Sequence, residues 1–114
     1  MNKNNRKTVL LDLDGVLNDY CGVYNENFIP PLKKEAENFL KELNKEFDVI
    51  IFSARNILLV QKWINDNNLS QYIHSITNKK VPAFLHIDDR CLQFKGNYQT
   101  TIKQIKNFKV YWEK

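Results

Sequence analysis

The chain has 114 residues, 43% of them hydrophobic, and a formal net charge of +4. This length fits one domain, so we expect a single unit over residues 1–114 with its own core. The two cysteines have no metal-binding spacing, and no apolar run reaches the length of a bilayer span. These features exclude a disulfide framework and predict a cytoplasmic protein without a membrane partner. The modest, dispersed charge favours ordinary solvation over nucleic-acid binding.

The first predicted strand begins at Thr8 and ends at about Asp14. It is apolar on both faces, which is typical of a central parallel strand that is covered on both sides. Asp12 and Asp14 interrupt it at its C-terminal end, immediately before Gly15. The two acids are either solvated loop residues or the start of a site, because ligands bind at the carboxyl ends of parallel strands.

The rest of the chain alternates between helical and strand-like patterns. A long loop over residues 15–29 comes first, and loops of this length in compact domains usually carry function. We expect helices over residues 30–45, 57–66 and 97–107, and strands over residues 47–52, 73–76, 83–87 and 110–112. This alternation predicts an open parallel sheet with helices on both faces.

Polar side chains follow the predicted strands at the sheet edge where the strands end. They are Asp12 and Asp14 after the first strand, Ser53, Ala54 and Arg55 after the second, Lys79 and Lys80 before the fourth, and Asp88 and Asp89 after it. Four carboxylates so close would repel one another unless one takes up a proton or a cation lies between them. Mg²⁺ fits best, because it binds a few carboxylates and keeps waters and phosphate oxygens as its other ligands. Such a site binds phosphate and offers Asp12 as a nucleophile.

Four short motifs together resemble the haloacid dehalogenase (HAD) superfamily of phosphatases, in its small capless form. They read D-L-D-G-V-L-N at 12–18, F-S-A-R at 52–55, T-N-K-K-V-P-A at 77–83 and I-D-D-R at 87–90. The resemblance covers nearly the whole chain, and the motifs occur in the family's order at the correct strand ends. It implies a three-layer, Rossmann-like open parallel sheet with strand order 5-4-1-2-3 and no cap domain.

The resemblance also implies a role for each acid. Asp12 would attack phosphorus and bind Mg²⁺. Asp14 would protonate the leaving oxygen, then activate water, and its backbone carbonyl would bind the metal. Asp88 would bind Mg²⁺ directly, and Asp89 would lie nearby or act through a water.

Four other residues are expected to bind or position the phosphoryl group. Ser53 would donate a hydrogen bond to a phosphoryl oxygen, with Ala54 and Arg55 beside it as substrate-binding residues. Arg55 either pairs with phosphate or forms a salt bridge to a rim carboxylate. Lys80 would neutralise charge on Asp12 and phosphate; the adjacent Lys79 is the alternative, and the spacing to Pro82 and Ala83 resembles the family's pattern better with Lys80 as the functional residue.

The function that these features predict is Mg²⁺-dependent hydrolysis of a phosphomonoester through an aspartyl-phosphate intermediate. The expected substrate is a small phosphorylated metabolite such as a sugar phosphate. Two alternatives stay open: a phosphatase for a macromolecule, such as a nucleic-acid end or a phosphoprotein, and a non-catalytic phosphate-binding module. Without a cap, the site is expected to be open, or to be covered by a second subunit of a homo-oligomer.

Overall fold

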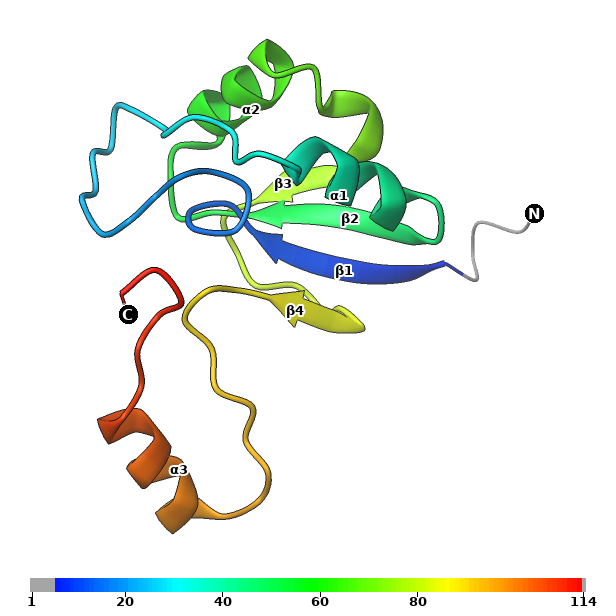
Figure 1. Cartoon of the computed structure of the whole chain (residues 1–114). Coiled ribbons are helices and arrows are strands. Elements are labelled where there is room, and N and C mark those ends of the chain that lie inside the picture. The colour runs from blue at the N-terminus through cyan, green and yellow to red at the C-terminus, as the bar shows by residue number, and fades with distance from the viewer. Residues whose placement is uncertain (1–5, 114) are drawn as a thin grey trace.

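The computed structural model describes residues 6–113 and contains one four-stranded sheet. Its strands are β1 (Lys7–Asp12), β2 (Phe47–Phe52), β3 (Ser75–Thr77) and β4 (Leu85–Ile87). They lie in the order β3-β2-β1-β4, and every neighbouring pair is parallel (Figure 1). The protein is therefore a small α/β domain with an open parallel sheet, and β1 occupies an inner position, as its apolar residues predict.

Two helices, α1 (Ala36–Asn44) and α2 (Ile57–Asp66), lie on the same face of the sheet (Figure 1). A short 3₁₀ helix, η2 (Ser70–Tyr72), follows α2. Alternate residues of β1 and β2 point toward these helices, because successive side chains of a strand lie on opposite faces. Their fully buried side chains form the core together with those of both helices: Leu11, Val49, Ile51, Leu40, Val60 and Ile64.

The helix predicted from Pro30 is shorter than expected and begins at Ala36. The residues before it are extended and pair with the loop after β1: the Asp19 amide donates to the Pro31 carbonyl at 3.0 Å, and the Lys33 amide donates to the Leu17 carbonyl at 2.8 Å. Backbone groups used in this way cannot form the first helical turn. Glu35, with φ at 74°, then turns the chain into α1.

The fifth strand, expected over residues 110–112, is wrong, because these residues form a turn in the described chain. The Glu113 amide donates to the Val110 carbonyl at 2.9 Å, and the Glu113 side chain accepts from the Val110 amide at 3.3 Å. The segment therefore satisfies its backbone locally instead of pairing beside β4. The order 5-4-1-2-3 is correct only for the four strands that form.

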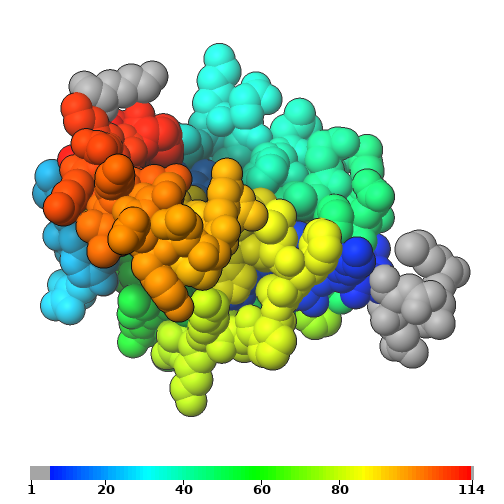
Figure 2. All heavy atoms as spheres, turned by 90° about the horizontal axis from the view of Figure 1, so that it is seen from below, coloured from blue at the N-terminus to red at the C-terminus, as the bar shows by residue number. Residues whose placement is uncertain are grey.

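The expected third layer is also not formed, because α3 (Tyr98–Lys106) contains no buried residue. This helix lies on the other side of the sheet from α1 and α2 (Figure 1). Seen from below, the orange part of the chain that contains α3 lies beside the yellow residues around β4 (Figure 2). Ile102 and Ile105, on the apolar face of this helix, are 52% and 59% exposed. In residues 6–113, no helix has both the length and the apolar composition that crossing a bilayer requires.

Candidate functional site

The loop that leaves β1 is shaped by a glycine and a buried asparagine. Gly15 has φ at +82°, a left-handed conformation that residues with a Cβ rarely adopt. Asn18 is fully buried and accepts hydrogen bonds from the amides of Gly15 and Tyr20, both at 3.1 Å. Its side-chain amide donates to Asp14 Oδ1 at 3.0 Å. Asn18 therefore fixes both the turn and the carboxylate of Asp14.

Three of the four predicted acids come together beside this loop. Parallel pairing aligns Leu11 with Ile87, so that the residues following β4 lie beside the end of β1. Asp12, Asp88 and Asp89 each offer a carboxylate oxygen, and these oxygens lie within 4.8 Å of one another. Asp88 is exposed, and the other two are partly buried. Oxygen ligands at this spacing are suited to a hard divalent cation.

Among residues 6–113 no ion pair involves this acidic cluster, and the pKa values of two of its members are raised. Burial raises the pKa of Asp12 to about 8, with further contributions from the charges of Asp88, Asp89 and Asp14. The pKa of Asp89 is also raised, first by burial and then by Asp88, whereas a hydrogen bond from Trp112 opposes the rise. A cation bound among these carboxylates would favour their ionised forms.

Asp14 is turned away from this cluster and faces Arg55. Arg55 Nε donates to Asp14 Oδ2 at 2.9 Å and to Oδ1 at 3.2 Å, and Nη2 donates to Oδ1 at 3.1 Å. The guanidinium also donates to the Asn25 carbonyl at 2.7 Å and lies 4.6 Å from the Tyr24 ring centroid. The Arg55 side chain is 1% exposed. Of the two roles left open for Arg55, the structure shows the salt bridge, and the guanidinium has no free face for phosphate.

The other predicted phosphate-binding residues differ in their exposure to solvent. Ser53 is buried directly after β2, and its hydroxyl accepts a hydrogen bond from the Arg55 amide at 3.1 Å. Ala54, between them, is exposed. Lys79 and Lys80 lie exposed in the loop between β3 and β4, and neither takes part in the ion pairs of residues 6–113. The role of Lys80, and the choice between it and Lys79, therefore stays a prediction.

Two aromatic residues to which the sequence analysis gave no role reach the site from residues 110–113. Tyr111 donates its hydroxyl hydrogen to the Gly15 carbonyl at 2.6 Å. Trp112 donates its indole N–H to Asp89 Oδ2 at 3.2 Å. Because residues 110–112 were predicted as a strand, their contacts with the site were not expected. Asn18, in the loop after β1, also contributes to the site and was given no role. The signal that could have indicated it is a polar residue four positions after Asp14 in an otherwise apolar stretch.

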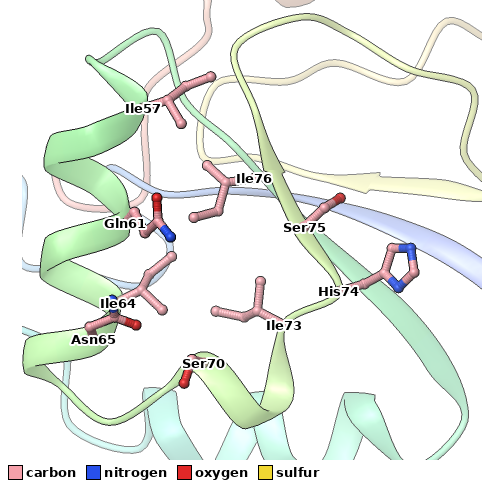
Figure 3. A pocket seen from close by; sticks show the side chains of 9 residues that line it. All are labelled: Ile57, Gln61, Ile64, Asn65, Ser70, Ile73, His74, Ser75 and Ile76. Atoms are coloured by element: carbon pink, nitrogen blue, oxygen red, sulfur yellow. The ribbon is translucent and has the colours of Figure 1, made fainter.

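A separate groove of about 290 Å³ lies between α2 and β3, away from the acids. Ile64, Ile73 and Ile76 point into it, with the polar side chain of Gln61 among them (Figure 3). The exposed His74 points away from these side chains (Figure 3). Among residues 6–113 no Asp, Glu, Lys or Arg lines this groove.

Comparisons of the chain with protein-family models, with curated proteins and with solved structures found no match. The assignment of a function therefore depends on the geometry of the residues themselves.

Proposed function

We propose that the protein is a HAD-like phosphomonoester hydrolase that depends on Mg²⁺. The observation that carries this proposal is the meeting of Asp12, from the end of β1, with Asp88 and Asp89, from the end of β4. The three oxygens lie at the carboxyl edge of a parallel sheet, which is the usual ligand-binding edge of this architecture. The order of the motifs along the chain supports the same assignment.

The acidic cluster fits Mg²⁺ by its donor chemistry. All three side chains offer carboxylate oxygens, and the pKa of Asp12 is raised to about 8 by burial and then by the neighbouring carboxylates, so a cation is needed to keep Asp12 ionised at neutral pH. Mg²⁺ held by these residues would neutralise that charge and attract the oxygens of a phosphate group. The fit requires no residue beyond those that the structure places together.

The proposed reaction has two steps on this chain's own residues. A carboxylate oxygen of Asp12 attacks phosphorus, the bond from phosphorus to the ester oxygen breaks, and the departing alkoxide takes a proton from Asp14. Water then attacks phosphorus, gives a proton back to Asp14, and releases free Asp12 and inorganic phosphate. Because Asp14 is held by Arg55 and Asn18, it must give up part of that hydrogen-bond network to reach the ester oxygen.

The test is hydrolysis of an aryl phosphate by the whole chain, with Mg²⁺ and after removal of cations by EDTA. We expect turnover only with Mg²⁺ and no measurable turnover by Asp12→Asn. Asp66→Asn is the matched control, because it makes the same chemical change at an exposed residue at the end of α2. Full activity after chelation, or near-normal activity of Asp12→Asn, would contradict the proposal.

The contact between Asp14 and Arg55 favours a second candidate function, a phosphate-binding module without turnover. A carboxylate whose two oxygens both accept from a buried guanidinium is poorly placed to donate a proton. The two functions differ for Asp14→Asn. A phosphatase should lose about 10²–10⁴-fold in turnover of an alkyl phosphate and less with an activated aryl phosphate. A binding module should show no turnover with or without the substitution, while still binding phosphate when Mg²⁺ is present.

A further inference from the structure

The last described residues form a compact turn at the ligand-binding edge of the sheet. We call residues 110–113 the C-terminal turn. Val110 is 1% exposed, and the Glu113 amide closes the turn on the Val110 carbonyl at 2.9 Å. The red C-terminal residues lie near the blue loop that follows β1 (Figure 1). A buried anchor and a closed turn hold the two aromatic residues between them in place.

One of these two aromatic residues contacts the loop after β1, and the other contacts a member of the acidic cluster. Tyr111 binds the Gly15 carbonyl, three residues after Asp12, and Trp112 binds a carboxylate oxygen of Asp89. Gly15 and Asp89 are themselves in close contact, because a Cβ on Gly15 would lie 2.1 Å from Asp89 Oδ2. The C-terminal turn thus connects the loop of β1 to the residue that follows β4.

The indole of Trp112 is held on several sides. The Tyr20 ring meets it edge-on, with centroids 6.0 Å apart and an interplanar angle of 89°. The Arg90 guanidinium lies 5.3 Å from its ring centroid. A Cβ on Gly22 would lie 3.2 Å from the ring, so the backbone of the 15–29 loop packs closely against it. The N–H is therefore aimed at Asp89 by a fixed ring.

We propose that Trp112 is a positioning residue for the cation site, holding the carboxylate of Asp89 in the orientation that faces Asp12 and Asp88. This inference rests on the proposed function, because it assumes that the acidic cluster binds Mg²⁺. A carboxylate can rotate about its last bond, and a hydrogen bond to one oxygen limits that rotation. Partners of metal-binding carboxylates commonly change affinity about 10–100-fold when they are removed.

The experiment measures Mg²⁺ binding to the whole chain by titration calorimetry, without substrate. Trp112→Phe keeps the aromatic packing against Tyr20 and removes the N–H donor. Trp63→Phe is the matched control, because the Trp63 indole also donates at 3.2 Å but to the Pro30 carbonyl, away from the acids. We expect wild type and Trp63→Phe to bind equally and Trp112→Phe to bind about 10-fold more weakly.

A second measurement leaves Trp112 unchanged. In Trp63→Phe, Trp112 is the only tryptophan of the chain, so its fluorescence reports on its own surroundings. We expect a saturable change with Mg²⁺ at the dissociation constant that calorimetry gives. Equal binding by Trp112→Phe, or no fluorescence change during measured binding, would overturn the inference and leave the proposed function standing. No Mg²⁺ binding by wild type would overturn both.

Discussion

Replacing Arg55 by Met should destabilise the protein by about 3 kcal/mol, because it leaves the Asp14 carboxylate without its partner. Removing one partner of a buried ion pair costs about 3–5 kcal/mol. Asp14 retains 21% exposure and its hydrogen bond from Asn18, so water and that amide compensate in part, and we take the lower end of this range. The substitution also removes the hydrogen bond from Arg55 to the Asn25 carbonyl, which connects the 15–29 loop to the residues after β2. In a domain of this size the melting temperature should fall by about 12 °C or more.

Urea unfolding followed by circular dichroism measures this loss. The series contains wild type, Arg55→Met, Asp14→Asn and the double variant, so that the double-mutant cycle isolates the pair. Lys62→Met is the control, because Lys62 and Asp66 form an exposed pair that should contribute less than about 1 kcal/mol. A loss for Arg55→Met no greater than that of the control would refute the reasoning, as would the absence of coupling in the cycle.

Three further substitutions test other parts of the structure. Gly15→Ala should cost about 1–2 kcal/mol through its left-handed backbone and should also weaken Mg²⁺ binding, because its Cβ displaces Asp89; unchanged affinity in calorimetry would contradict this. Folded Asp12 keeps its proton up to about pH 8, whereas the unfolded chain loses it near 3.8, so between these values the cation-free protein should lose stability as the pH rises. Asp12→Asn should remove much of that slope and unfold at higher urea than wild type at pH 7.5, and a parallel pair of pH curves would count against the burial of this charge. Asn56→Ala removes the side chain that accepts from the Leu58 and Leu59 amides at the start of α2, and should cost about 0.5–2 kcal/mol in urea unfolding, with no change in Mg²⁺ affinity.

Elements whose signal is local were predictable from the sequence. The apolar run of β2 predicts its observed limits, Phe47 and Phe52, because a strand buried between neighbours is mainly apolar, and only Asp48 interrupts the run. Asn56 caps α2 as its residue type indicates. The three acids meet because parallel pairing brings strand ends to one edge, which follows from topology alone.

Features that depend on tertiary partners were not predictable. A start of the first helix at Pro30 was wrong because residues 31–33 pair with the loop after β1, a contact between segments that sequence periodicity does not contain. Val110 to Trp112 has the composition of a strand, but its aromatic side chains bind Gly15 and Asp89 instead. The sequence also left open which anion the Arg55 guanidinium binds, because phosphate and carboxylate both accept two parallel hydrogen bonds from it.

The strand order has a consequence for how the chain folds during its synthesis. β1 is made first, but its two neighbours are β2, 40 residues later by register, and β4, whose His86 pairs with Leu10. Such long-range pairing loses loop-closure entropy before its contacts contribute favourable free energy, which slows folding. The nascent chain therefore carries an incompletely paired inner strand until residue 87 has left the ribosome. Tyr111 and Trp112 emerge later still, so their contacts with Gly15 and Asp89 form only after the strands of the sheet have been made.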